Sequence, residues 1–212
     1  MTGKKEFVSR AYNFEIRAEQ DEGTYTIEGR PIIYDSMTDL YWLHEVIEKG
    51  ALDEANIDDV RFLVNHDVSK IPLARAKADN DNSTMQLFVD EEGLRMVVQL
   101  DVENNTEARN LYSAIKRGDI TGMSFMFTIS EEEWEDLETD KPTRRITKID
   151  EVVEVSAVTF PAYEDTEIFA RDKSNMEAMR KKLEDEKRAK NQGAKSKLDF
   201  ETRTLLKMYG GI

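Results

Sequence analysis

The sequence contains no cysteine, only two histidines and only four prolines among its 212 residues. The lack of cysteine excludes disulfides, zinc–thiolate sites, iron–sulfur clusters and a cysteine nucleophile. There is also no apolar run long enough to cross a bilayer, and no charged-then-apolar leader at the start. We therefore expect a soluble protein that uses no membrane and works in the compartment where it is made.

Positive charge is scarce except near the end of the chain. The net charge is −14, which disfavours nucleic acid as the main ligand because an acidic protein repels phosphates. Residues 173–212 hold eleven Lys or Arg against six Asp or Glu, a net +5, so residues 1–172 carry −19. We predict a folded domain over 1–172 and a basic tail over 173–212, which is helical or disordered.

Alternating apolar and polar residues predict strands through most of the first 172 residues. The alternation covers residues 12–18, 60–64, 85–89, 94–100 and 123–129. Two of these segments, 85–89 and 94–100, flank a glycine-containing turn and give the clearest hairpin.

Other segments show different patterns. A helix is predicted from a cap at Thr106 to Gly118, with its apolar residues on one face. An acidic loop is expected over 131–140, then a strand over 144–150 and a nearly continuous apolar strand over 152–160. The fold class is mainly β: an antiparallel β-barrel with one or two flanking helices, because closure would remove exposed strand edges.

The two histidines differ in their surroundings. His66 follows an apolar strand at the point where the strand meets a loop, which is where rigid scaffolds hold catalytic groups. A solvated turn histidine is the alternative. His44 has Glu48 four residues on, where a zinc helix would carry a second histidine. A metal-dependent hydrolase built on His44 and Glu48 is therefore a weak option, and we expect no metal and no cofactor.

Ser124 and Glu154 stand out within apolar strands. Ser124 follows Gly122 and Met123, and a nearby glycine would let a substrate backbone approach closely. Glu154 lies between valines, where a carboxylate is costly unless it is protonated or paired with a cation. The alternatives are that Ser124 faces solvent, and that Glu154 pairs with an arginine such as Arg75 or reaches solvent.

Together these residues supply the parts of a nucleophilic hydrolase. A serine gives an oxygen nucleophile, an imidazole exchanges protons near neutral pH, and a carboxylate orients the imidazole. The chain order would be His66, Ser124, Glu154. Their spacing in the sequence does not show whether they meet in space.

Six segments in order resemble the prohead (capsid maturation) serine proteases of tailed bacteriophages, over roughly residues 14–172. They are IEGRPIIYD (27–35), EVIEKGAL (45–52), LVNHD (63–67), IPLAR (71–75), IKRGDITGMSF (115–125) and EVSAVTFPA (154–162). The resemblance implies a herpesvirus-assemblin-like β-barrel and a serine endopeptidase. It matches His66 to the family's catalytic histidine, Ser124 to its nucleophile, and Glu154 to the third member, with Glu151 in reserve.

The resemblance also implies a role and partners. The enzyme would act in the host cytoplasm, inside the immature capsid, on the scaffold segment of the major capsid protein and on itself; self-association is possible. We place the oxyanion or substrate region near Gly122, Met123 and Arg75. The alternative is a non-catalytic internal scaffold or assembly chaperone with the same barrel, in which Ser124 is an ordinary strand residue.

Overall fold

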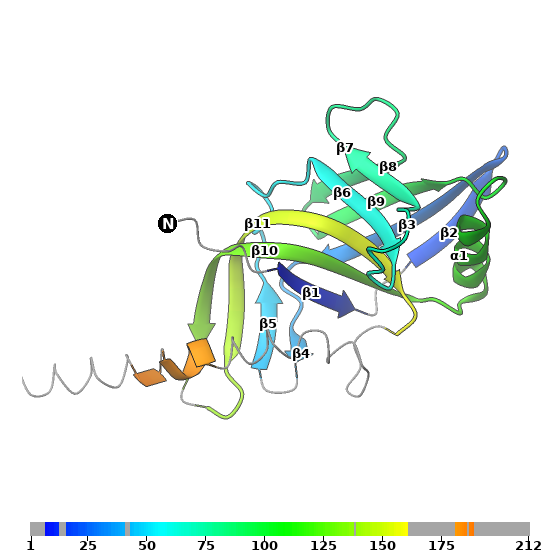
Figure 1. Ribbon diagram of the computed structural model, residues 1–212. Coiled ribbons are helices and arrows are strands. Elements are labelled where there is room, and N and C mark those ends of the chain that lie inside the picture. Colours follow the sequence, from blue (N-terminus) through cyan, green and yellow to red (C-terminus); the bar gives the residue numbers. More distant parts are fainter. Residues whose placement is uncertain are drawn as a thin grey trace, which may run out of the picture.

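The structure is a computed structural model that describes residues 7–12, 16–40, 43–137, 139–160, 181–185 and 187–188. Strands dominate it, and they form two sheets (Figure 1). The first sheet joins β1 (Phe7–Tyr12), β4 (Thr38–Leu40), β5 (Leu43–Ile47), β6 (Asp59–Val64), β7 (Ala74–Lys77), β10 (Gly122–Glu135) and β11 (Thr143–Val158). The second joins β2 (Ile16–Asp21), β3 (Thr24–Ile33), β8 (Met85–Asp90) and β9 (Gly93–Leu100). The prediction of a mainly β fold is confirmed.

β11 organises the first sheet. Along one edge it pairs antiparallel with β10, whose other edge pairs antiparallel with β1. Along its other edge it pairs in parallel with β5 in its first half and with β6 in its second half. The apolar run of the sequence therefore lies in a strand with neighbours on both sides, as expected for a buried strand.

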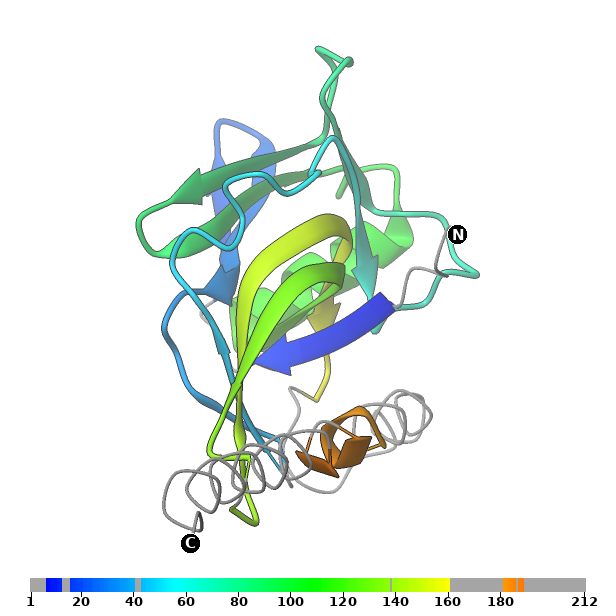
Figure 2. The same ribbon diagram turned by 90° about the vertical axis from the view of Figure 1, so that its left-hand side faces the viewer.

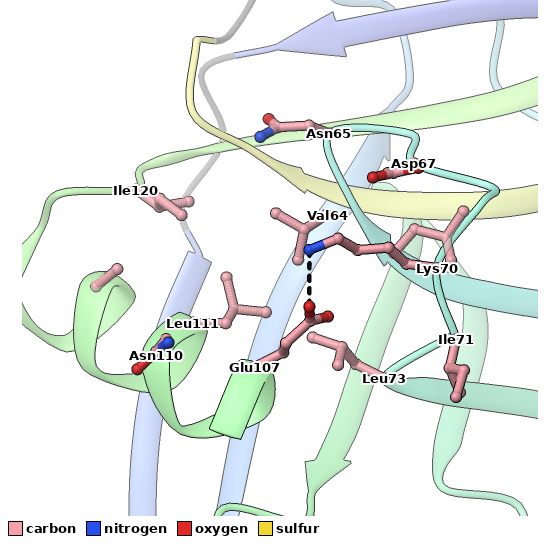
Figure 3. A pocket seen from close by; sticks show the side chains of 12 residues that line it. Val64, Asn65, Asp67, Lys70, Ile71, Leu73, Glu107, Asn110, Leu111 and Ile120 are labelled. Carbon is pink, nitrogen blue, oxygen red and sulfur yellow. Dashed lines mark hydrogen bonds and ion pairs between the residues drawn. The ribbon is translucent and has the colours of Figure 1, made fainter. Parts of the chain in front are cut away.

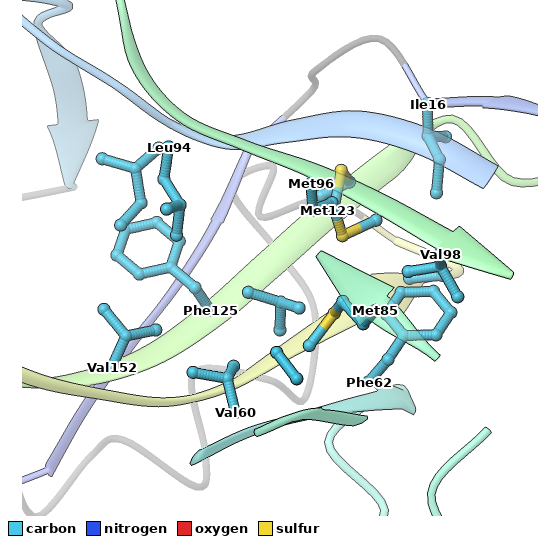
Figure 4. Close-up of a cluster of buried hydrophobic side chains, with 14 of the residues drawn as sticks. Ile16, Val60, Phe62, Met85, Leu94, Met96, Val98, Met123, Phe125 and Val152 are labelled. Carbon is cyan, nitrogen blue, oxygen red and sulfur yellow. The ribbon is translucent and has the colours of Figure 1, made fainter. Parts of the chain in front are cut away.

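The two sheets are not closed into a barrel, so the expectation of a closed antiparallel barrel is wrong in this respect. They have separate hydrogen-bond ladders, and they meet through buried side chains. Figure 4 shows part of this shared core, which includes Phe62 of β6, Met96 of β9, and Met123 and Phe125 of β10. Apolar burial between the sheets, at roughly 25 cal/mol per Å², holds them without a shared ladder.

The helix α1 (Thr106–Arg117) is present as predicted, and its buried face is also as predicted. The cap differs: the Asn105 side chain accepts hydrogen bonds from the backbone of Glu107 and Ala108, so Asn105, not Thr106, is the N-cap. Gly118 ends the helix with φ = 78°, a left-handed conformation that glycine adopts without a Cβ clash.

The acidic loop predicted over 131–140 is a strand from 131 to 135, whereas residues 136, 137, 139 and 140 lie in the connection to β11. β10 runs on to Glu135, which pairs with Thr143 of β11. Arg144 binds the carboxylate of Glu132, so part of the negative charge is neutralised across the hairpin. Charge alone led to a loop assignment that cross-strand pairing overrides.

Other predictions meet the limits of the described residues. The strand expected over 12–18 is divided, with β1 ending at Tyr12 and β2 beginning at Ile16; residues 13–15 lie outside the description. The boundary at 172 and most of the 173–212 tail also lie outside it, and residues 181–185 and 187–188 are helical. Within the described ranges, no helix is long and apolar enough to span a membrane.

Candidate active site

Ser124 lies in β10 between two strands. Its register partners are Ala11 of β1 on one side and Ser156 of β11 on the other. The neighbouring Met123 and Phe125 are completely buried, which fixes this part of β10 in the core. Ser124 itself is 0% exposed. The serine therefore has a defined position, and it is covered in this conformation.

His66 is held just beyond the end of β6 by an unusual turn. Asn65 and His66 have φ values of 52° and 57°, a left-handed conformation that is uncommon outside glycine. The backbone N–H of Asn65 donates to Ala157, and the Asn65 amide exchanges hydrogen bonds of 3.0 and 2.9 Å with Thr159. Such strained residues persist where the surroundings hold them, often at functional sites.

The structure brings His66, Ser124 and Glu154 together. His66 Nε2 lies 2.5 Å from Ser124 Oγ, and His66 Nδ1 contacts Glu154 Oε1. The His66 side chain is 11% exposed and that of Glu154 4%. The parallel pairing of β6 with β11 explains the contact, because β6 runs beside the end of β11 that holds Glu154, and His66 is the second residue after β6. Glu154 thus pairs with His66, whereas Arg75 pairs with Asp59.

Ser156 is a site residue that the sequence reasoning missed. Its hydroxyl donates to Glu154 Oε2 at 2.7 Å and accepts from the backbone N–H of His66 at 3.2 Å. It is 0% exposed. The available signal was its spacing, since a residue two positions after Glu154 in a strand shares its face.

Two residues of β1 also reach the site and were not predicted. Ser9 Oγ lies 3.0 Å from His66 Nε2 and 3.5 Å from Ser124 Oγ. The Ser124 hydroxyl donates to the carbonyl oxygen of Arg10 at 2.7 Å. No sequence signal pointed to them, because their place depends on the pairing of β1 with β10.

The other residues predicted for the site are Gly122, Met123, Glu151 and Arg75, and they lie at different places relative to Ser124. Gly122 and Met123 begin β10 and pair with Val158 and Ala157 of β11. Glu151 pairs with Thr128 and forms a bridge to Asn56, three positions before Glu154. Arg75 lies on β7, which is separated from β10 by β6 and β11. The structure therefore does not bring Arg75 to Ser124.

The loop that carries His66 also forms a wall of a pocket of about 400 Å³. Figure 3 shows the pocket between this loop and α1, with an ion pair of 2.7 Å between Lys70 and Glu107 across it. Asn65 and Asp67, the neighbours of His66, both line it. The turn that presents His66 thus borders an open hollow of the surface.

A metal centre at His44 gains no support from the described residues. His44 lies on β5, 3.9 Å from Asp39, and Glu48 lies beside Arg145. No group of three or more His, Asp or Glu in the described ranges is arranged to hold a metal ion.

A second buried polar cluster lies on the opposite face of β1. Arg10 donates to both carboxylate oxygens of Glu45 at 2.5 and 2.9 Å, and Arg144 links Glu45 to Glu132. Burial alone would raise the pKa of Glu45, but Arg10 and Arg144 outweigh it and hold the pKa below its usual range. Glu132 follows the same pattern. Burial raises its pKa, but Arg144 and Lys182 lower it by more, so the pKa lies below its usual range.

No curated protein matches the sequence. Among solved structures, the capsid assembly protease of bacteriophage T4 is similar at 13% identity with a TM-score of 0.45, over 75% of this chain and 100% of that one. The family model described as caudovirus prohead serine protease matches residues 12–182. The chain therefore belongs to the caudovirus prohead serine protease family.

Proposed function

We propose that this chain is a serine endopeptidase that uses Ser124, His66 and Glu154. The observation that carries the proposal is the chain of contacts from Ser124 Oγ to His66 Nε2 and from His66 Nδ1 to Glu154. A nucleophile within hydrogen-bond reach of a base, which is itself oriented by a third group, is the pattern of nucleophilic hydrolases on unrelated folds.

In the first half of the reaction, Ser124 Oγ attacks the carbonyl carbon of a substrate peptide bond. His66 Nε2 takes the hydroxyl proton as the new C–O bond forms. When the tetrahedral intermediate collapses, the C–N bond breaks and His66 returns that proton to the leaving amine. The products are an acyl-enzyme, in which Ser124 carries the amino-terminal part of the substrate, and a released carboxy-terminal fragment with a new free amino group.

In the second half, water attacks the acyl-enzyme and gives its proton to His66. The Ser124 oxygen leaves, and it recovers a proton from His66. Glu154 accepts a hydrogen bond from Nδ1–H throughout, which keeps Nε2 free to act as a base and stabilises the imidazolium that forms. Ser156 holds the second oxygen of Glu154 and the backbone of His66.

Membership of the family supports a proposal for the biological substrate. We propose that the chain cleaves the scaffold segment of the major capsid protein, and also itself, inside the immature capsid in the host cytoplasm. We further propose residues 1–172 as the protease domain and 173–212 as a basic tail. A non-catalytic scaffold would have no use for a buried carboxylate that contacts an imidazole next to a serine, which disfavours that alternative.

Co-expression of the chain with the major capsid protein of the same phage tests the proposal. We expect mass spectrometry to find the capsid protein shortened with the wild type and full length with Ser124→Ala. Ser130→Ala is the matched control, because Ser130 lies on the same strand, is exposed, and bonds to Lys148 instead of the site. Shortened capsid protein with Ser124→Ala would contradict the assignment.

A further inference from the structure

β1 covers Ser124, the nucleophile of the proposed active site. It is an edge strand of the first sheet and pairs with β10 along its whole length, with Ala11 opposite Ser124. Figures 1 and 2 both show β1, in blue, alongside the green β10. Besides His66, the Ser124 hydroxyl contacts Ser9 and Arg10 of this strand. A peptide that approaches Ser124 along β10 would meet β1 already in place.

The contacts from β1 also occupy groups that the reaction requires. A serine hydroxyl has one proton, so its donation to the Arg10 carbonyl withholds that proton from His66. Ser9 Oγ lies 3.0 Å from His66 Nε2, the atom that would accept the proton. In this conformation the reacting groups are therefore assembled but engaged by the backbone and a side chain of β1.

We propose that β1 is an intramolecular inhibitor that fills the place of the substrate, and that the substrate binds as an extended peptide along the edge of β10. This inference rests on the proposed function. When β1 leaves, β10 becomes an edge strand with unpaired N–H and C=O groups, which is the surface that an extended peptide joins by strand addition. The substrate class is thus a segment that can be drawn out as a strand.

β1 is attached to the rest of the molecule by side-chain contacts that must break before it can leave. Arg10 is bound to Glu45, and Val8 and Ala11 are buried, so the strand is docked firmly. These contacts belong to β1 itself, whereas β10 keeps its ladder with β11 when β1 leaves. Release would therefore open the site without dismantling the sheet behind it.

A reversible disulfide tests whether β1 must move. Phe7 and Thr128 are register partners, and directly opposed residues of antiparallel strands lie within disulfide range, with Cα atoms about 4.5–5.5 Å apart. The chain has no native cysteine, so Phe7→Cys with Thr128→Cys gives one defined bond. The chain continues from β1 into β2, which begins at Ile16, so one end of β1 is already anchored. Oxidation of the cysteine pair then anchors the other end.

The measurement is the rate at which a fluorophosphonate probe labels Ser124 in the full chain. We expect at least tenfold slower labelling of the oxidised pair than of the reduced pair. The matched control is Glu19→Cys with Thr26→Cys, a register pair of the β2–β3 hairpin, whose labelling should not depend on oxidation. A second variant, Val8→Asp, places a charge on the buried side of β1 and should speed labelling at least tenfold.

The outcomes separate this inference from the proposed function. Equal labelling of the oxidised and reduced pairs would overturn the inhibitory role of β1, yet Ser124 would still be shown to react. If no form reacts at Ser124, including a folded Val8→Asp chain, the proposed function fails and this inference falls with it. If Val8→Asp shows no cooperative thermal unfolding, it is not folded and its labelling is not used. The comparison of the oxidised and reduced disulfide pair then decides whether β1 inhibits labelling.

Discussion

The two faces of β1 meet two buried polar clusters that have similar parts but different abilities. On one face, Glu154 contacts His66, which contacts Ser124. On the other face, Glu45 binds Arg10 and Arg144. Each cluster is built around a carboxylate on a strand of the first sheet that is almost completely buried. The partners of the two carboxylates differ: one is an imidazole and the others are guanidiniums.

The difference shows why a buried charge by itself does not mark an active site. Guanidiniums stay protonated at all relevant pH values, so the Glu45 cluster cannot pass a proton and can only hold strands together. An imidazole gains and loses a proton near neutral pH, and it has a second nitrogen that reaches a hydroxyl. The imidazole of the Glu154 cluster can therefore exchange a proton with the hydroxyl of Ser124.

The largest expected effect comes from changing the carboxylate that orients the imidazole. Glu154→Gln should slow cleavage by about 10⁴-fold, because an amide no longer fixes the imidazole tautomer that leaves Nε2 as a base. The fold should persist, since the amide keeps the shape of the side chain. The measurement is the rate of capsid-protein cleavage in a Val8→Asp background, with circular dichroism to check folding.

Glu151→Gln is the matched control for that experiment. Glu151 is the reserve candidate for the third catalytic residue and lies in the same strand. We expect its rate to stay within a few-fold of the parent. A large loss in Glu151→Gln with a small loss in Glu154→Gln would reverse the assignment.

The corresponding change in the second cluster should affect stability and not chemistry. Glu45→Gln leaves Arg10 and Arg144 buried without their shared carboxylate, and breaking a buried pair in this way costs about 3–5 kcal/mol. Urea unfolding measures the loss. Glu91→Gln is the control, because its pair with Lys49 is on the surface and such pairs contribute about 1 kcal/mol or less. Equal losses in the two variants would contradict the structural role of Glu45.

Acid should remove the same contribution without mutation. The pKa of Glu45 is lower in the folded chain than its usual value of 4.5, so its pairing stabilises the fold fully above that pH. The stabilisation is lost as the pH falls below 4.5 and through the lowered folded value. The free energy of unfolding should therefore fall more steeply below pH 4.5 in the wild type than in Glu45→Gln, as measured by urea titrations between pH 3 and 7. Parallel curves would contradict this.

The sequence predicted the three members of the Glu154 cluster, but not the residues that surround them. His66, Ser124 and Glu154 were singled out because each is chemically unusual where it stands, and the resemblance implied a catalytic role for each. Ser156 and Ser9 were missed because a serine in a strand is ordinary until pairing shows what it faces. Pairing depends on register between segments far apart in the chain, which alternation alone does not specify.

The same limit explains the errors in the fold. The hairpin of β8 and β9 and the helix α1 are local, so pattern and capping chemistry predicted them. The parallel pairs of β11 with β5 and β6 join distant segments, and the expectation of a closed antiparallel barrel failed there. The Glu45 cluster was not predicted at all, because nothing in the sequence links Arg10 to Glu45 before β1 is placed.

The smallest expected effect sharpens the comparison within the first cluster. Ser156→Ala removes one hydrogen bond to Glu154 and one from the backbone of His66. A bond to a charged group contributes about 1.5–3 kcal/mol, and the carboxylate keeps its contact with His66, so we expect about a tenfold loss in kcat, with KM nearly unchanged. Ser156→Thr retains the hydroxyl and should recover most of the loss. If Ser156→Thr is as slow as Ser156→Ala while both melt like the parent, the hydroxyl is not what positions Glu154 and His66; the packing at this buried position would then account for the effect.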